Sequence, residues 1–251
     1  MSIDWAVELA ENPNTYTPIG PNTERIVTDR FVLWIGRVNT WNVAQRFSFP
    51  VEELDEVIEE VRSLLRERGR TSCAWEIGSH ATPANLPELL LARGFADDQP
   101  EPLAIGMALT EEPAPAPEDV VVKQVETQDE YAASERIAMV AFNEDPSQEI
   151  PEYKPDPHNR IYIAIVDGEI VARASASFSE HAVTLFGGAT LPEARGRGAY
   201  RALVAARWRD AVERGTPLAV TQAGEMSRPI LTRLGFREVG TVRALGDKFE
   251  A

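Results

Sequence analysis

Apolar residues along this chain recur with helical spacing in some stretches and strand spacing in others, which predicts a mixed α+β protein. The strongest helical pattern opens at Pro50 and ends at Gly69, with apolar side chains at Val51, Leu54, Val57, Ile58, Val61, Leu64 and Leu65. Weaker helical patterns lie at 4–11, 86–93, 127–142, 199–214 and 227–234. Strand-like runs lie at 30–38, 71–77, 103–109, 120–125, 161–166, 169–178, 182–191, 217–222 and 239–249. Because Asp167-Gly168 predicts a tight hairpin, we expect mostly antiparallel sheets flanked by helices.

One stretch combines a strand end, a glycine-rich turn and a helix start. Residues 187–204 read GGATLPEARGRGAYRALV, and the turn contains Arg195, Gly196, Arg197 and Gly198. The first amides of a helix have no acceptor within it, glycine lets a ligand approach the backbone, and arginine pairs with phosphate oxygens. The turn therefore predicts an anion site that suits a diphosphate. A solvated turn before a surface helix is the alternative, which the strand–turn–helix order disfavours.

A proline- and alanine-rich segment divides the chain. Residues 111–119 read EEPAPAPED, a composition typical of an extended, semi-rigid spacer. We therefore predict a first domain at 1–110, a linker at 111–119 and a second domain at 120–251.

The order of elements in the two halves indicates an internal repeat. In each half a long helix ends in Glu-Arg-Gly, at 67–69 and 213–215, and a later short helix ends in Gly-Phe, at 94–95 and 235–236. A chance match is the alternative, because glycine commonly ends helices. The copies differ before the long helix, where the first has RFSFP in place of RGRG. Since Pro50 has no backbone N–H, we predict that the first copy is degenerate and does not cradle a diphosphate.

The composition is that of an ordinary soluble protein, with 43% hydrophobic and 26% charged residues in a chain of 251. No run of 18 apolar residues predicts a membrane span, and the N-terminus lacks the pattern of a secretory signal. Cys73 is the only cysteine, which excludes an intrachain disulfide and a cysteine zinc cluster. The histidines His80, His158 and His181 have no metal-site spacing, so we predict no metal. A cytoplasmic location fits these features.

The net charge of -15 is unevenly placed, with -12 in residues 1–119 and -3 in residues 120–251. Such a field repels nucleic acid and anionic membranes and favours a cationic partner. The alternative is that the acidity only keeps the protein soluble. A nucleic-acid binder is a further hypothesis, which the acidic balance opposes, and it would use the arginines of the last long helix, Arg201, Arg207, Arg209 and Arg214.

The segments LPEARGRGAYRALV and LTRLGF resemble the GNAT superfamily of acetyl-CoA-dependent N-acetyltransferases. The family's phosphate motif is Arg or Gln, two residues, Gly, one residue, and Gly or Ala. Arg195 and Gly198 match this motif, and Tyr200 departs from it. The resemblance covers about 120–249, and the whole chain is similar to tandem members in which a degenerate copy precedes an active one. It implies two GNAT-like copies, each with a mixed, mostly antiparallel sheet.

The resemblance also implies the cofactor-binding residues. The pantetheine arm of acetyl-CoA would pair like an added strand along Ala189, Thr190 and Leu191. The pyrophosphate would lie on the backbone of Arg195, Gly196, Arg197, Gly198, Ala199 and Tyr200.

The catalytic residues are less evident. The position of the family's tyrosine acid is Leu231, and the strand position of its base falls near Leu185, so neither can titrate. We name Glu144 and His181 as substitutes, with Glu225 and Tyr200 as further candidates, and an ordinary surface or packing role as the alternative for each. Proximity and a water relay could also suffice.

The function predicted from these observations is an acetyl-CoA-dependent N-acetyltransferase. It would move an acetyl group directly to a primary amine of a small, cationic molecule, with no nucleic-acid or membrane partner, as a monomer or homodimer. The alternative is a non-catalytic acyl-CoA-binding or sensor protein, which the missing acid and base favour. Consumption of acetyl-CoA with a panel of amines distinguishes the two.

Overall fold

The computed structural model describes residues 3–20, 23–36, 41–98, 102–145 and 147–250. Its packing divides the chain into two compact units. The first unit comprises Met1–Met107, Gln222–Pro229 and Glu238–Ala251. The second unit comprises Ala108–Thr221 and Ile230–Arg237. Among the described residues, no helix is long and apolar enough to cross a membrane.

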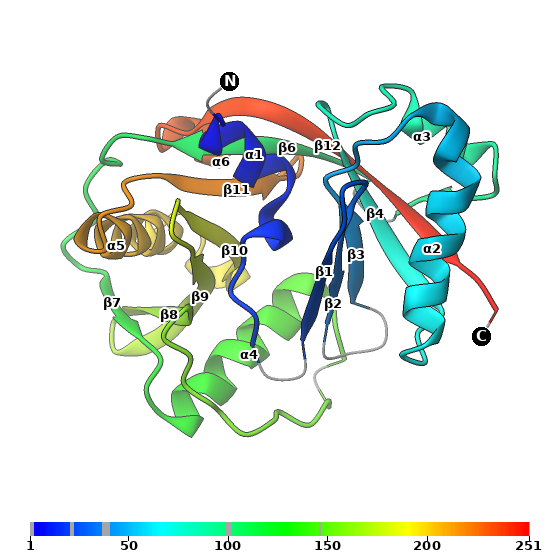
Figure 1. Ribbon diagram of the computed structural model, residues 1–251. Helices are drawn as coiled ribbons and strands as arrows, with labels where there is room; N and C mark the ends of the chain where they lie inside the picture. The colour runs from blue at the N-terminus through cyan, green and yellow to red at the C-terminus, as the bar shows by residue number, and fades with distance from the viewer. Residues whose placement is uncertain (1–2, 21–22, 37–40, 99–101, 146, 251) are drawn as a thin grey trace. The chain divides into compact units, whose positions relative to one another are not determined.

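The first unit contains a mixed sheet with the strand order β1-β2-β3-β4-β12-β6, and β5 pairs with β12 (Figure 1). The strand pairs β1–β2, β2–β3 and β4–β12 are antiparallel, and β3–β4 is parallel. The strands are β1 (Glu24–Val27), β2 (Val32–Ile35), β3 (Asn42–Gln45), β4 (Ser72–Gly78), β5 (Ala96–Asp97), β6 (Leu103–Leu109) and β12 (Arg237–Lys248). The helices are α1 (Trp5–Glu11), α2 (Leu54–Arg66), α3 (Leu86–Leu91) and the 3-10 turns η1 (Pro13–Thr15) and η2 (Val51–Glu53).

The helix α2 carries the strongest apolar pattern and forms one side of the first unit's core. Its buried face packs with Leu33 of β2, with Trp75 of β4 and with Phe31, which directly precedes β2. Burying such side chains stabilises the fold by about 1.5–3 kcal/mol each. Gly69 ends the helical segment in the left-handed region, with φ of +67°.

The second unit contains the strand order β11-β10-β9-β8-β7. All its described pairs are antiparallel except β10–β11, which is parallel. The strands are β7 (Val121–Gln124), β8 (Asn159–Val166), β9 (Glu169–Phe178), β10 (Val183–Thr190) and β11 (Ala219–Ala223). The helices are α4 (Gln128–Phe142), α5 (Ala199–Glu213), α6 (Arg228–Arg233) and the 3-10 turn η3 (Pro192–Ala194).

Two long helices cover the faces of the second unit's sheet. Both α4 and α5 pack on β8, β9 and β10, from opposite sides (Figure 1). The helix α4 begins with a variant of the capping box. The Thr127 hydroxyl accepts from the Glu130 amide at 3.3 Å, and the Glu130 carboxylate accepts from the amide of the preceding residue, Glu126, at 2.9 Å. Fully buried alanines of β9 allow close packing in this layer: Ala172, Ala174 and Ala176.

The predicted fold class is confirmed, and most predicted elements occur close to their predicted bounds. The hairpin at Asp167 and Gly168 has φ of +53° and +86°, as the Asp-Gly pair requires. The strands β1, β3 and β5 were not predicted, because they are short and β3 carries polar residues at Asn42 and Gln45 that are nevertheless fully buried. The predicted strand at 30–38 is shorter, and residues 37–40 lie outside the described residues.

The last strand, β12, is grouped differently from the prediction. The predicted second domain, 120–251, includes it, but β12 pairs with β4 from Val242 opposite Gly78 to Lys248 opposite Ser72. Asp247 of β12 is buried and accepts two hydrogen bonds from Arg62 of α2, at 2.9 and 2.7 Å. This bidentate pair fixes the C-terminal strand in the first unit's sheet.

Candidate functional site

The turn between β10 and α5 has the backbone conformation expected of an anion cradle. Gly196 and Gly198 lie in the left-handed region with φ of +80° and +82°, which glycine adopts readily. Gly198 is the N-cap of α5, a helix of 15 residues. The amides of the first turn, from Ala199 on, have no acceptor inside the helix. The positive end of the helix dipole adds to their attraction for an anion.

The predicted spacer contributes to this turn. A Cβ added at Gly198 would overlap the ring of Pro117, so glycine is required here by packing as well as by φ. At Gly196, in contrast, an added Cβ would meet nothing within 4 Å. The side chain of Arg197 forms an exposed ion pair with Asp167 of the β8–β9 hairpin at 2.8 Å. Exposed pairs of this kind are weak, so Arg197 can exchange this partner for a phosphate at little cost.

The strand β10 separates from β11 shortly before the turn. The two strands pair in parallel only at Val183 and Thr184 within the described register. Beyond this point the described partners of β10 lie on β9: Ala189 opposite Arg173, Thr190 opposite Ala172, and the Leu191 amide on the Val171 carbonyl at 2.9 Å. Ala189, Thr190 and Leu191, the residues predicted to bind the pantetheine arm, therefore bond to β9 along one backbone edge. Their opposite edge has no described pairing with β11.

A β-bulge lies between the separation point and the turn. The register of β10 on β9 shifts between Phe186 and Ala189, and Gly187 has φ of +58°. Phe186 is 43% exposed although it lies in an inner strand. An exposed aromatic side chain beside an interrupted ladder is typical of a ligand site rather than of a core.

Two buried arginines flank this bulge. Arg173 of β9 is 7% exposed and pairs with Glu135 of α4 at 3.0 Å. Arg207 of α5 is 1% exposed. Burial lowers the pKa of both guanidinium groups, and in Arg207 hydrogen bonding to Tyr200 opposes that shift. Arginine nevertheless stays charged in proteins, so the bulge lies in a positive field.

Tyr200, the departure from the family motif, is accommodated by a glycine. A Cβ at Gly188 would lie 2.6 Å from the Tyr200 ring, so the ring packs directly on the strand backbone. The pair places an aromatic ring against β10 at the bulge.

Comparisons with known proteins agree with this geometry. Residues 125–236 match the family model described as "Acetyltransferase (GNAT) family". Over these residues the second unit is similar to that family. GNAT acetyltransferases are acyltransferases that use acetyl-CoA. No curated protein matches the chain.

Several solved structures are similar in fold to the whole chain. A GCN5-related N-acetyltransferase from Kribbella flavida has a TM-score of 0.73 at 22% identity, over 98% of this chain and 96% of that one. A tandem GNAT protein from the clavulanic acid biosynthesis pathway has a TM-score of 0.60 at 13% identity, over 98% and 94%. A functionally unknown protein from Staphylococcus epidermidis has a TM-score of 0.64 at 12% identity, over 92% and 96%. At these identities the likeness shows a common fold.

The two predicted catalytic residues lie far apart in the second unit. Glu144 is exposed just after α4, where its amide bonds to the Met139 carbonyl at 2.9 Å. The helix α4 runs along the sheet toward the end that carries the RGRG turn. His181 lies in the β9–β10 connection, before β10 begins. Since β10 has eight residues, His181 is separated from that turn by about 26 Å of strand.

The sequence did not indicate that four side chains lie at the bulge. Three of them donate to backbone carbonyls there, and the fourth, a glutamate, pairs with one of these donors: Arg173, Arg207, Thr221 and Glu135. The signal for Arg173 is a single charge in the alanine-rich strand VARASASF, where solvation cannot explain it. Arg207 was considered only as one of a row of helix arginines, and its burial removes it from any nucleic-acid-binding face. Leu231 and Leu185 are buried at 1% and 3% exposure, as core residues.

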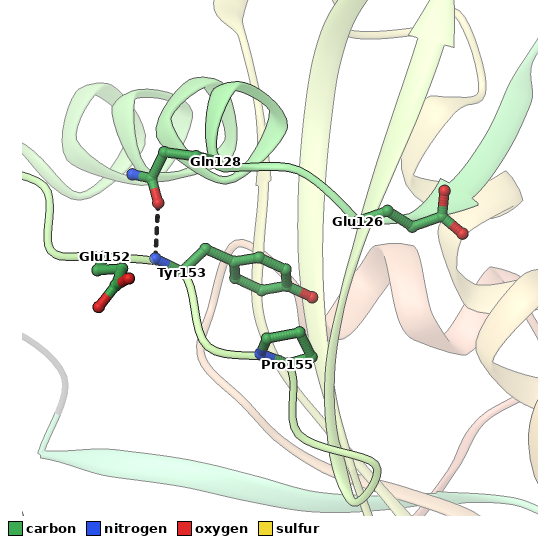
Figure 2. A pocket seen from close by; sticks show the side chains of 5 residues that line it. All are labelled: Glu126, Gln128, Glu152, Tyr153 and Pro155. Atoms are coloured by element: carbon green, nitrogen blue, oxygen red, sulfur yellow. Dashed lines mark hydrogen bonds between the residues drawn. The ribbon is translucent and has the colours of Figure 1, made fainter.

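A separate pocket of 460 Å³ lies in the second unit (Figure 2). Its lining comprises Glu126, Gln128, Glu152, Tyr153 and Pro155. Gln128 accepts from the Tyr153 amide at 2.6 Å, which holds the loop against the start of α4. The same loop carries Pro157, whose carbonyl accepts from Arg214 at the C-terminal end of α5. Because α5 is about 22 Å long, this pocket is remote from the RGRG turn.

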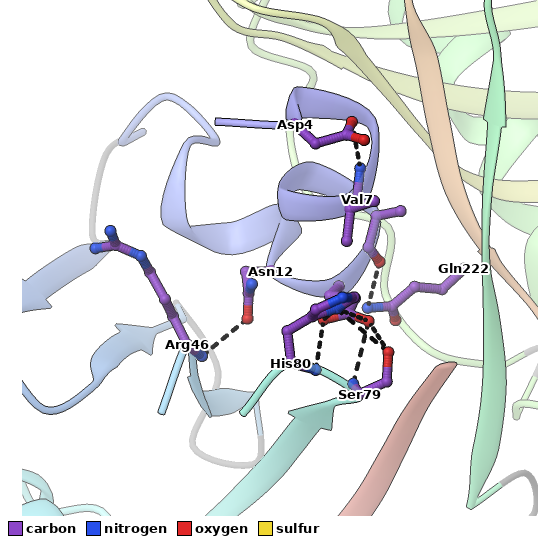
Figure 3. Close-up of polar contacts among 9 residues, drawn as sticks. Asp4, Val7, Asn12, Arg46, Ser79, His80 and Gln222 are labelled. Atoms are coloured by element: carbon purple, nitrogen blue, oxygen red, sulfur yellow. Dashed lines mark hydrogen bonds and ion pairs between the residues drawn. The ribbon is translucent and has the colours of Figure 1, made fainter. Parts of the chain in front are cut away.

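In the first unit, the chain itself fills the space beyond a similar short parallel pair. The strand β3 pairs in parallel with β4 at Val43 and Ala44, and Arg46 comes shortly after with φ of +58°. The Arg46 amide donates to the side chain of Asn12 at 2.9 Å (Figure 3). Beyond it Ser48 forms a parallel bridge with Thr82.

Aromatic side chains complete this filling. Phe47 stacks on Trp75 with ring centroids 4.8 Å apart, and both are buried. Glu11 accepts from the amides of Ser79 and His80, at 3.1 and 3.3 Å, and so joins the end of α1 to the end of β4. Across the described parts of the chain, no cluster of three or more His, Cys, Asp or Glu side chains could hold a metal ion.

Proposed function

We propose that this chain is an N-acetyltransferase that transfers the acetyl group of acetyl-CoA directly to a primary amine of a small, cationic molecule. The amine nitrogen attacks the thioester carbonyl carbon, a C–N bond forms and the C–S bond breaks. The amine loses a proton, and the departing thiolate gains one to become CoA. No enzyme-bound acyl intermediate is involved, because positioning the two reactants supplies much of the rate.

The RGRG turn is the observation that carries this proposal. Its two glycines adopt positive φ at the start of a 15-residue helix, next to a strand whose edge is released by β11. A diphosphate fits the free amides of the turn, and an extended arm fits the released edge beside Ala189, Thr190 and Leu191. The net charge of -15 supports a cationic acceptor.

For the proton transfers we propose Glu144, which lies toward the same end of the sheet as the RGRG turn. Its exposure is consistent with exchange of protons with solvent. His181 belongs to the same prediction, but its place beyond the far end of β10 gives it no comparable support. A water relay fits the site equally, because no titratable group replaces the buried Leu231.

A non-catalytic acyl-CoA-binding or sensor protein is the second candidate. Two buried leucines, Leu185 and Leu231, stand where the family's base and acid would be, and this observation favours it. The two functions share the binding step and differ in turnover.

Calorimetric titration with acetyl-CoA, followed by incubation with a panel of amines, tests both candidates. The enzyme binds acetyl-CoA and releases CoA only when an acceptor amine is present. Arg197→Glu weakens binding by placing a carboxylate at the turn, whereas Arg209→Glu, on the exposed side of α5, serves as the charge-matched control. Binding without CoA release by any amine supports the sensor, and absence of binding contradicts both.

We also propose that the first unit is a degenerate copy of the second, with copies at 1–110 and 120–251 joined by the linker 111–119. The matching parallel pairs and the common φ of +58° at Arg46 and Gly187 support this proposal. In it, β12 is the last strand of the second copy and pairs within the first unit's sheet. We propose a cytoplasmic location, which the reduced, buried thiol of Cys73 fits.

A further inference from the structure

Three backbone carbonyls around the β10 bulge accept hydrogen bonds from side chains. They belong to Leu185 and Gly187 of β10 and to Ser175 of β9. The donors come from three different elements, β11, β9 and α5. Buried carbonyls need partners, and a bulge removes the regular ones.

Arg173 reaches the bulge from the α4 side of the sheet. Its Nη1 donates to the Gly187 carbonyl at 3.1 Å, and its Nη2 donates to Glu135 at 3.0 Å. A Cβ on Gly187 would lie 2.7 Å from Nη1, so the guanidinium lies directly against the strand. The Glu135 carboxylate aims the fork at the bulge, since a bidentate group is oriented by its partner.

Arg207 reaches β9 beside the bulge from the α5 side. Its Nη1 donates to the Ser175 carbonyl at 3.0 Å, and Nε donates to the Leu203 carbonyl of its own helix, also at 3.0 Å. Ser175 is opposite Phe186, the last β10 residue before the register shift. The bond therefore ties the helix that begins at the RGRG turn to the strand pair at the bulge.

Thr221 closes the parallel ladder at the separation point. Its hydroxyl donates to the Leu185 carbonyl at 2.8 Å, one residue after Val220 makes the last described β10–β11 pair. A side chain thus takes the acceptor that a continuing backbone ladder would use. Leu185 is thus the last β10 residue with a described bond to β11.

We propose that Arg173 and Arg207 are positioning residues of the acyl-transfer site, which fix the β10 bulge from both faces of the sheet so that the edge of β10 beyond it is held open for the acyl-thioester arm. This inference rests on the proposed function. It assigns the diphosphate to the RGRG turn and the arm to the bulge, so the two parts of the ligand depend on different residues.

Stability alone does not explain these arginines. Burying a guanidinium is costly, and replacing a buried charged group by apolar residues of similar volume is often neutral or stabilising. Arg207 has carbonyls and Tyr200 as its described partners rather than a carboxylate. Its five donors in a rigid fork bridge two elements, which a single apolar side chain cannot do.

The test compares two ligands with four variants. The ligands are acetyl-CoA and 3′-phosphoadenosine 5′-diphosphate, which has the diphosphate but lacks the pantetheine arm. The variants are Arg173→Met, Arg207→Met, Thr221→Val and the control Arg209→Met, an exposed arginine on α5. Binding is measured by calorimetry well below the melting temperature of each variant.

We expect Arg173→Met and Arg207→Met to weaken acetyl-CoA binding about tenfold to a hundredfold, the equivalent of one charged hydrogen bond, with the fragment affected less than about twofold. Arg→Lys at either position keeps the charge without the fork and recovers only part of the loss. Thr221→Val, which adds no charge change, weakens acetyl-CoA by a few-fold and leaves the fragment unchanged. The Arg209→Met control binds both ligands as the parent protein does.

Equal weakening of both ligands, or no weakening in any variant that folds, would overturn this inference while leaving the proposed function intact. If both arginine variants fail to fold, Thr221→Val decides by the same comparison. A parent protein that binds neither ligand contradicts the proposed function, and this inference with it.

Discussion

The strand β3 of the first unit and β10 of the second each pair in parallel with a later strand over two residues and then pass through a residue with φ of +58°. The two strands differ in the groups that contact the chain at and beyond that residue. In the first unit the Arg46 amide is bonded to Asn12, and Thr82 pairs beside Ser48. In the second unit, the side chains of Arg173 and Thr221 donate hydrogen bonds to backbone carbonyls at the bulge. The described partners of the outer edge of β10 include no such chain segment.

This difference shows that a short parallel strand pair followed by a residue with positive φ can lie in a packed core or at a ligand site. Which of the two it becomes depends on the segments that pack next to it. The first unit fills the place with aromatic rings and its own loop, which are apolar and rigid. The second has two glycines at the bulge and two in the turn, which admit a ligand. The matching position after the parallel pair is Glu76 in β4 and Thr221 in β11.

The largest expected effect comes from removing the filling of the first unit. Trp75→Ala deletes a fully buried ring stacked on Phe47, so it should destabilise the protein by about 3–5 kcal/mol. Because the ligand site is proposed in the second unit, the dissociation constant for acetyl-CoA should change less than about twofold at a temperature where the variant is folded. Chemical denaturation and calorimetry measure the two quantities. A large loss of binding by folded Trp75→Ala would mean that the first unit takes part in the site.

The second expected effect is on the cradle itself. Gly198→Glu places a side chain on Pro117, forces φ of +82° on a non-glycine residue and adds a carboxylate, so acetyl-CoA binding should fall more than about a hundredfold. Gly215→Glu is the matched control, because Gly215 has φ of +80° at the other end of α5 and nothing within 4 Å of an added Cβ. Both variants carry similar backbone strain. Equal binding losses in both would assign the effect to folding rather than to the turn.

Sequence patterns predicted the second unit well because its signals are local. The capping box at Thr127, the Asp167-Gly168 hairpin and the strand–turn–helix at the RGRG turn each depend on residues adjacent in sequence. The glycine-rich turn could therefore be located before its geometry was known. The sequence also distinguished this turn from the start of the long helix in the first unit, which is preceded by RFSFP and begins at Pro50.

The remaining features depend on contacts between distant residues. Asn42 and Gln45 are polar yet fully buried in β3, so their strand carries no apolar alternation. The pairing of β12 with β4 depends on Asp247 meeting Arg62, which are 185 residues apart. Arg207 looked like one more surface charge because only the fold shows that its turn of α5 faces Ser175. Position along the chain alone could not separate Arg207 from Arg209.

The third effect is a pH dependence of stability that belongs to the first unit. Burial raises the pKa of Glu76 to about 7, with Asp98 adding to the shift and a hydrogen bond from Gln222 opposing it. A carboxyl with a raised pKa in the folded state holds its proton where the unfolded chain has lost it. Stability should therefore fall as pH rises from about 4.5 to about 7, by at most about 3 kcal/mol.

Denaturation at pH 5 and pH 8 measures this change, and Glu76→Gln should abolish most of it. Glu76→Gln keeps the shape of the side chain without the ionisation, so it should be more stable than the parent at pH 8 and similar at pH 5. An unchanged pH dependence in Glu76→Gln would contradict the assignment. The second unit has Thr221 at the matching position, so Thr221→Val should leave this pH dependence as it is.

The smallest effect concerns the hydrogen bond from the Arg46 amide to Asn12. Asn12→Ala removes the acceptor of the Arg46 amide, and leaving that amide without a partner should cost about 1–2 kcal/mol. Asn85→Ala is the control, because Asn85 is exposed and makes no side-chain bond as the cap of α3. Hydrogen exchange of the Arg46 amide gives a local measure, and it should quicken in Asn12→Ala and not in Asn85→Ala. Unchanged protection at Arg46 would show that this segment is held by the Thr82 pairing and the Phe47–Trp75 stack rather than by Asn12.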